Sequence, residues 1–277
     1  MKIIDTFNEI QQCYPNGIFD ISCWGKYADG IAPDFSNKIK NDTADYDFEQ
    51  DILPILQSAI SDAQKLTAAH NSFVSATADL ADKMREKLGT ELDVTIVFYL
   101  GLCNDAGWAT TLDKKPAILI GVEKVIELGW FDERNMQALI YHELGHIWHY
   151  GARNTTESPE TVKGKALWQV YSEGIAMYAE QMLCENMNFY HQDTDGWLDW
   201  CNANRKNLYQ EYVRRIDSGE SVQDFFGDWC SYNGKSDVGY YIGCELVNAL
   251  AEKHSLSELA DLKLCEIENQ LRKMCED

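Results

Sequence analysis

The sequence has few basic residues and no long apolar run. Lys and Arg number 24 against 45 Asp and Glu, which gives a formal net charge of −21. A surface this acidic repels phosphate groups, so we expect no nucleic-acid partner and no binding to anionic membranes. The longest near-continuous apolar stretch, residues 94–103, has about ten residues, half of what a membrane span requires. The composition therefore predicts a soluble protein that binds neither nucleic acid nor membranes.

Paired cysteine motifs and a targeting segment are also absent. The nine cysteines include no C-x-x-C pair, and the chain is too long to depend on disulfides for its stability. We expect reduced thiols, most of which fill the core. The first residues, MKIIDTFNEI, lack the basic segment and apolar core of a signal peptide. These features predict a cytoplasmic protein.

The composition otherwise is that of a folded globular protein, with 277 residues, 45% hydrophobic and 25% charged. Without a repeat or a linker, we expect a single domain over residues 1–277 in three portions. Residues 1–90 are expected to be helical, because apolar residues recur at helical spacing from 47 to 88 before Gly89. Residues 91–131 predict a small sheet, rich in β-branched residues. Residues 132–277 again read as helices.

Residues 142–146 read His-Glu-Leu-Gly-His, on a predicted helix for which Asp132 is a good N-cap. His142 and His146 are four residues apart, so they share a face with Cβ atoms about 5–6 Å apart. This spacing lets two imidazole nitrogens bind one zinc ion at about 2.0–2.1 Å. Glu143 would lie near the metal, where it can take a proton from zinc-bound water and pass it to a leaving amine. The motif predicts one zinc ion per chain.

A zinc hydrolase site needs a third protein ligand and one open position. Glu173 is the better candidate, because a Glu flanked by apolar residues is costly to bury unless it is paired or bound to metal; an ordinary ion pair is the alternative. Gly174 lowers helix stability by about 1 kcal/mol relative to Ala, and a close approach of two helices would explain its presence. Glu180, on the same face, contacts either a ligand histidine or solvent.

His149 is a less suitable ligand. It lies two turns from His142, about 10 Å along the helix axis, which is too far to share the metal easily. Three interpretations stay open for its side chain: support of a ligand, contact with substrate, or a structural role.

The HExxH motif, followed by Glu173 in an E-G-x-A context, resembles the gluzincins, the zincin clan of thermolysin and the zinc aminopeptidases. More narrowly, residues 93–250 resemble a family of predicted zinc-dependent proteases, with shared features at residues 104–121, 142–146, 173–174 and 239–243. The resemblance implies that His142, His146 and Glu173 are the zinc ligands and that Glu143 is the general base.

The fold that this resemblance implies is α+β and zincin-like, mostly helical with a small mixed sheet beside the active-site helix. An edge strand within residues 108–120 would line the cleft and pair with an extended peptide. Gluzincins often use a Tyr or His to stabilise the oxyanion, which makes Tyr240 or Tyr241 a candidate, with Tyr240 favoured; packed aromatic residues are the alternative. No G-A-M-E-N-like motif is present, so exopeptidase specificity is not implied.

The resulting hypothesis is a zinc metallopeptidase that hydrolyses peptide bonds in a peptide or protein substrate. The alternative is a non-catalytic zinc-binding protein, in which the metal serves structure or the recognition of a partner. Glu143 argues against this alternative, because a structural site has no use for that carboxylate and is usually closed by a fourth protein ligand. A fourth protein ligand such as His149 or Cys184 would favour the non-catalytic alternative.

Overall fold

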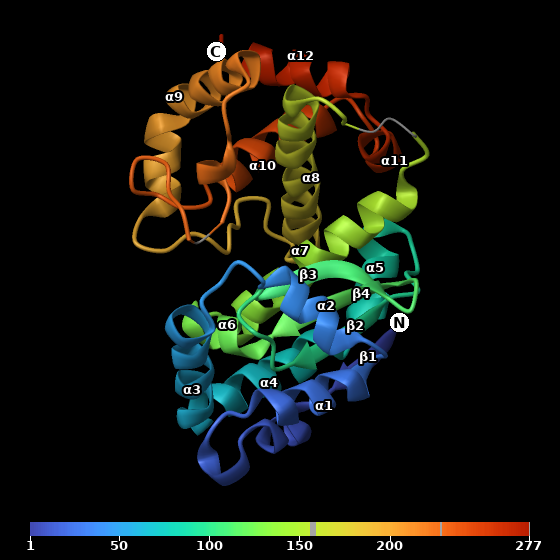
Figure 1. Ribbon diagram of the computed structural model, residues 1–277. Coiled ribbons are helices and arrows are strands. Elements are labelled where there is room, and N and C mark those ends of the chain that lie inside the picture. The colour runs from blue at the N-terminus through green and yellow to red at the C-terminus, as the bar shows by residue number, and fades with distance from the viewer. Residues whose placement is uncertain (156–158, 228, 277) are drawn as a thin grey trace. The chain divides into compact units, whose positions relative to one another are not determined.

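The strands that the structure describes form one mixed sheet in the order β1-β2-β4-β3 (Figure 1). They are β1 (Lys2–Asp5), β2 (Thr95–Tyr99), β3 (Gly107–Leu112) and β4 (Lys115–Gly121). β1, β2 and β4 are parallel, whereas β3 is antiparallel to β4 and forms one edge of the sheet. The small mixed sheet is therefore confirmed. β1 is not predicted from the sequence, because four residues are too few to give a periodic pattern.

The computed structural model describes residues 1–155, 159–227 and 229–276. The chain divides into two compact units, Met1–Glu143 (unit 1) and Leu144–Asp277 (unit 2). The division falls inside helix α7 (Glu133–Ala152), so this helix contributes residues to both units. Asp132 accepts a hydrogen bond from the Asn135 N–H at 3.1 Å, which confirms it as the cap of this helix.

One face of the unit 1 sheet is covered by two helices. Phe98 of β2 and Gly107 of β3 lie on this face, because each is in register with the same residue of β4. Phe98 packs against Phe73 of α4 (Ala63–Thr77), with ring centroids 5.0 Å apart. At Gly107, an added Cβ would lie only 2.8 Å from Leu139 Cδ1 of α7. Glycine thus allows α7 to pack closely on β3.

The opposite face of the sheet is covered by α2 (Phe35–Asp42). Tyr99 of β2 packs edge-on against Phe35, with ring centroids 5.3 Å apart. Trp108 of β3 lies under the ammonium group of Lys38, which is 4.3 Å from the ring centroid. Unit 1 therefore places its sheet between helical layers, and the fold class of mixed α+β with a predominance of helix is confirmed.

The other helices of unit 1 include those predicted between residues 47 and 88. Pro54 stands in the first turn of α3, where its missing N–H is tolerated. Gly89 ends α5 in the left-handed conformation, with φ of 65°. These helical segments are η1 (Phe7–Cys13), η2 (Pro15–Gly17), α1 (Ile21–Ile31), η3 (Phe48–Ile52), α3 (Leu53–Ser61), α5 (Leu80–Leu88) and α6 (Val122–Glu127).

Unit 2 is built around α8 (Val162–Leu183), which packs closely against α7 and α10 (Val238–Ala251). A Cβ on Gly174 of α8 would overlap the carbonyl group of Gly243 in α10. A Cβ on Gly145 of α7 would lie 2.8 Å from the Cα of Ala176 in α8. The close helix approach predicted at Gly174 is therefore confirmed. The elements of unit 2 after α7 are α8 (Val162–Leu183), α9 (Trp197–Ser218), η4 (Gln223–Phe225), α10 (Val238–Ala251), α11 (Leu256–Ala260) and α12 (Leu264–Met274).

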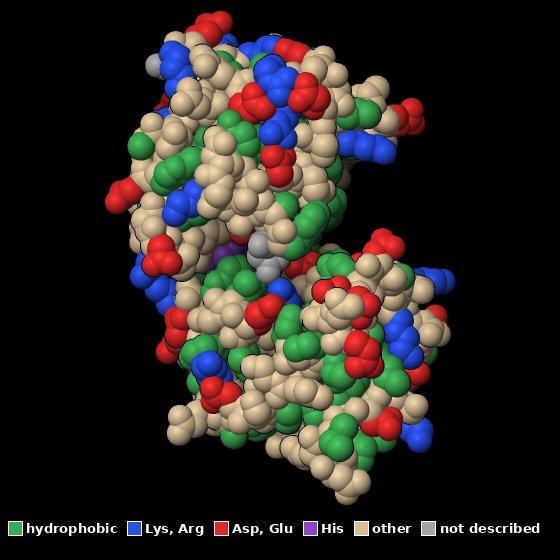
Figure 2. Space-filling view, turned by 60° about the vertical axis from the view of Figure 1, so that its left-hand side comes forward, with side chains coloured by type: hydrophobic (Ala, Val, Ile, Leu, Met, Phe, Trp, Pro, Cys, Tyr) green, Lys and Arg blue, Asp and Glu red, His purple; other side chains and the backbone are tan. Residues whose placement is uncertain are grey.

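Acidic and basic side chains are interspersed over the face that Figure 2 shows, despite the net charge of −21. Among the described residues, no helix combines the length and the hydrophobicity that crossing a membrane would require.

Candidate metal centre

His146 of α7 and Glu173 of α8 face each other within unit 2. Nε2 of His146 lies 3.2 Å from Oε2 of Glu173. Two ligands of a tetrahedral zinc ion with bonds of about 2.0–2.1 Å are separated by about 3.3–3.4 Å. The other ring nitrogen of His146, Nδ1, lies 3.4 Å from Oγ of Ser172. The imidazole is thus oriented with Nε2 toward the carboxylate, at the spacing of two zinc ligands.

His142 completes this group of ligands. It precedes His146 by one turn of α7, and the ligand atoms of His142, His146 and Glu173 all lie within 4.8 Å of one another. The side chain of His142 is buried, and the other two are half-buried. Two histidines and one glutamate are a known donor set of catalytic zinc sites, which leave one coordination position open. The structure therefore brings together the three residues that the sequence analysis selects.

His142 also belongs to a second group, with Glu180 of α8 and His191. The ligand atoms of these three residues lie within the same 4.8 Å limit, and all three side chains are buried. This group is close enough to bind a metal ion. Glu180 is predicted from the sequence as a possible neighbour of a ligand histidine, whereas His191 is not predicted. That histidine follows α8 in an irregular segment, where no periodic pattern marks it.

The two ring nitrogens of His191 already have protein partners. Nδ1 lies 3.0 Å and 2.9 Å from the two carboxylate oxygens of Glu180, and Nε2 lies 2.9 Å from the side-chain nitrogen of Gln192. Glu180 is fully buried, so its carboxylate needs hydrogen-bond partners such as His191. A metal ion bound between Glu180 and His191 would have to replace their hydrogen bond. The same holds for the first group, because Nε2 of His146 and Oε2 of Glu173 are also in contact at 3.2 Å. Both groups are close enough to bind a metal ion.

Glu143, between His142 and His146 in the sequence, is positioned by the sheet of unit 1. Its Oε2 accepts a hydrogen bond from the Ala109 N–H of β3 at 2.7 Å, and only 7% of the residue is exposed. A Cβ on Gly107 would lie 3.0 Å from Cγ and Oε1 of Glu143. Glycine at this position thus leaves room for the carboxylate beside β3.

His149 packs among aromatic side chains. It is fully buried, with its ring stacked on Trp168 at 5.2 Å and edge-on to Tyr171 at 5.4 Å. Burial, with smaller effects from His146 and Arg153, lowers the pKa of His149 to about 3. A neutral ring packed among aromatic side chains matches the structural interpretation among the three that the sequence leaves open. Among the described residues, neither His149 nor Cys184 belongs to a group of candidate metal ligands.

The two tyrosines at the start of α10 have different surroundings. Tyr241 is buried, and its hydroxyl donates to Oδ1 of Asn202 at 2.9 Å. Tyr241 is thus a packed core residue. Tyr240 is half-buried, with its ring edge-on to Phe226 at 5.8 Å. The role of Tyr240 in stabilising an oxyanion stays a prediction.

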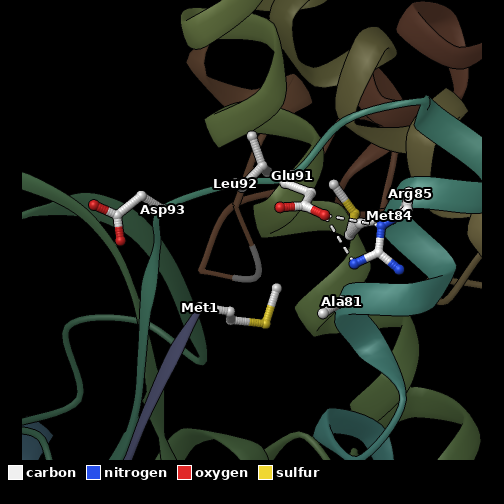
Figure 3. A pocket seen from close by; sticks show the side chains of 7 residues that line it. All are labelled: Met1, Ala81, Met84, Arg85, Glu91, Leu92 and Asp93. Atoms are coloured by element: carbon white, nitrogen blue, oxygen red, sulfur yellow. Dashed lines mark hydrogen bonds and ion pairs between the residues drawn. The ribbon is translucent and has the colours of Figure 1, made fainter.

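A separate pocket lies in unit 1, with a volume of about 290 Å³. Figure 3 shows that Arg85 and Glu91, two of its charged residues, bond each other. No histidine or cysteine lines the pocket, so it offers fewer candidate ligands than the groups that include His142. Its lining residues are Met1, Ala81, Met84, Arg85, Glu91, Leu92 and Asp93.

Comparisons with protein-family models, with curated proteins and with solved structures find no match to this chain. The function is therefore inferred from the chemistry of the site and from the resemblance of its motif.

Proposed function

We propose that the protein is a zinc-dependent peptidase of the gluzincin type, with a zincin-like fold. His142, His146 and Glu173 would hold one zinc ion per chain, and Glu143 would act as general base. The observation that carries the proposal is the 3.2 Å separation between His146 and Glu173, with His142 in the same group. The fourth coordination position would remain open for water or substrate.

Each side chain of the centre has a role in hydrolysis. Zinc bound there would lower the pKa of water and polarise the substrate carbonyl. Glu143 accepts the proton of the attacking water on a carboxylate oxygen and delivers it to the leaving amine. Tyr240 is our candidate for the donor to the developing oxyanion.

Glu180 and His191 would hold His142 in the orientation that binds zinc. A histidine that binds metal through one ring nitrogen usually donates from the other to a carboxylate, which fixes its orientation. Glu180 is the carboxylate grouped with His142, and His191 bonds both of its oxygens. We therefore assign Glu180 to orient His142 and His191 to hold Glu180 in place.

The free edge of β3 supports an extended peptide as the substrate. Because the Ala109 N–H points away from β4 toward Glu143, alternation places the backbone groups of Gly107 and Thr111 on the same outer side. Among the described strands, β3 pairs with β4 alone. A peptide aligned along this edge would pass beside the general base.

Metal content and hydrolysis, measured on the same preparations, test the proposal. Wild type should contain about one zinc ion per chain by elemental mass spectrometry, and Glu173→Ala should lose most of it. Glu143→Gln should keep zinc but cleave fluorescently labelled casein at least about a hundredfold more slowly, because the base is removed. Glu252→Ala, at an exposed position of unit 2, is the matched control and should behave as wild type.

Two results would contradict the proposal. Full zinc content in Glu173→Ala would show that the third ligand is wrong. Zinc in wild type without cleavage of casein or of a broad peptide mixture would instead support the non-catalytic zinc-binding alternative.

A further inference from the structure

The hydrogen bond between Glu143 and Ala109 occupies a backbone group that a substrate strand would also need. In an antiparallel pair, the residue opposite Ala109 would accept from its N–H and donate to its C=O. That N–H donates instead to Oε2 of Glu143, at 2.7 Å. One N–H cannot make two well-directed hydrogen bonds at full strength. A peptide paired at this position and the Glu143 carboxylate therefore compete for the same donor.

The surroundings of Ala109 allow this exchange. β3 is the edge strand of the sheet, and its residues from Gly107 to Ala109 are half-exposed. Trp108 and Thr110 direct their backbone groups to β4 by the same alternation, so their hydrogen bonds are kept when a peptide binds. The Glu143 carboxylate can turn away by rotation about its side-chain bonds, whereas the donor is fixed in the sheet. The carboxylate is thus the partner that moves.

We propose that the Ala109 N–H is a positioning group that holds Glu143 in the absence of substrate, and that an extended peptide displaces the carboxylate by pairing with β3. The base is then released beside the peptide bond only when a peptide lies along the strand. This inference rests on the proposed function and specifies its substrate as a chain with a free backbone carbonyl opposite Ala109. A small amide without such a carbonyl would leave the Glu143 carboxylate hydrogen-bonded to the Ala109 N–H.

Amide hydrogen exchange tests the first half of the inference in the zinc-loaded protein without substrate. In wild type the Ala109 amide should exchange slowly for an edge position, because its proton is bonded to Glu143. Glu143→Ala should speed its exchange at least about tenfold, while the Thr111 amide on the same edge should not change. Equal exchange of Ala109 in wild type and Glu143→Ala would overturn the proposal.

Peptide binding tests the second half of the inference, that a peptide displaces the Glu143 carboxylate from Ala109. Fluorescence anisotropy measures the dissociation constant of the fluorescein-labelled peptide Lys-Thr-Val-Ala-Val-Thr-Lys. Glu143→Gln retains a side-chain acceptor for the Ala109 N–H, whereas Glu143→Ala removes it. Neither variant should hydrolyse the peptide, because both lack the general base. Glu143→Ala should bind the peptide about three- to tenfold more tightly, the range of one net hydrogen bond. Equal dissociation constants would overturn the proposal, as would a complete lack of binding by both variants.

Proline substitutions supply the matched control. Ala109→Pro removes the donor at an edge position that tolerates proline, and it should abolish the difference between Glu143→Gln and Glu143→Ala. Thr111→Pro removes a neighbouring outer N–H and should leave the difference intact. A difference that persists in Ala109→Pro would overturn the inference. Zinc content and casein cleavage are measured separately, so failure of the proposed function is distinguishable from failure of this exchange.

Discussion

Oγ of Ser172 lies 3.4 Å from Nδ1 of His146, while the other ring nitrogen of that histidine lies 3.2 Å from Glu173. A polar partner on the second nitrogen fixes the orientation of a metal-binding imidazole. We expect Ser172→Ala to weaken zinc affinity about tenfold or more, in the range of losses known for such partners. Competition with a chelator measures the change, and Ser221→Ala, at an exposed position, is the control. Unchanged affinity in Ser172→Ala would show that Ser172 does not orient His146.

The two groups that share His142 make different predictions for His191. If zinc is bound by His146 and Glu173, His191→Ala should keep about one zinc ion per chain. It should nevertheless lower the free energy of unfolding by about 1.5–3 kcal/mol, because the buried Glu180 loses its hydrogen bonds from His191. Metal analysis and urea unfolding measure these two effects. Loss of zinc in a folded His191→Ala, together with its retention in His146→Ala, would place the metal in the second group.

The sequence predicts the parts of the centre that depend on local spacing. His142, Glu143 and His146 follow from one helical turn, and Glu173 follows from a carboxylate among apolar neighbours. His191 could not be found in this way, because only the tertiary packing of the segment after α8 brings it to Glu180. The hydrogen bond between Glu143 and Ala109 likewise depends on how α7 packs on β3, which no sequence period encodes.

Close packing around α8 predicts a strong effect of a single methyl group. Gly243→Ala should lower the free energy of unfolding by about 1–3 kcal/mol, because the added Cβ meets the backbone of α8, which cannot easily yield. Gly151→Ala in α7 is the matched control, since no atom lies within 4 Å of its added Cβ. The control should be neutral or stabilising by up to about 1 kcal/mol. Thermal unfolding of the two variants measures the contrast, and equal melting temperatures would contradict the close contact.

The buried ring of His149 predicts how stability depends on pH. Its pKa is lowered from an ordinary 6.5 to about 3 in the folded protein, mainly by burial. Below pH 6.5 the unfolded chain binds a proton that the folded protein does not bind, so this residue favours unfolding progressively as the pH falls toward 3. The effect is at most about 1.4 kcal/mol per pH unit.

We therefore expect wild type to lose roughly 2 kcal/mol more stability than His149→Phe between pH 7 and pH 5. Phenylalanine keeps an aromatic ring against Trp168 but cannot be protonated. Urea unfolding of both proteins at the two pH values, with zinc removed by a chelator, measures the difference without interference from metal binding. Equal losses in both proteins would mean that His149 is protonated in the folded state as readily as in the unfolded chain. The aromatic side chains around His149 would then not disfavour its protonated, charged form.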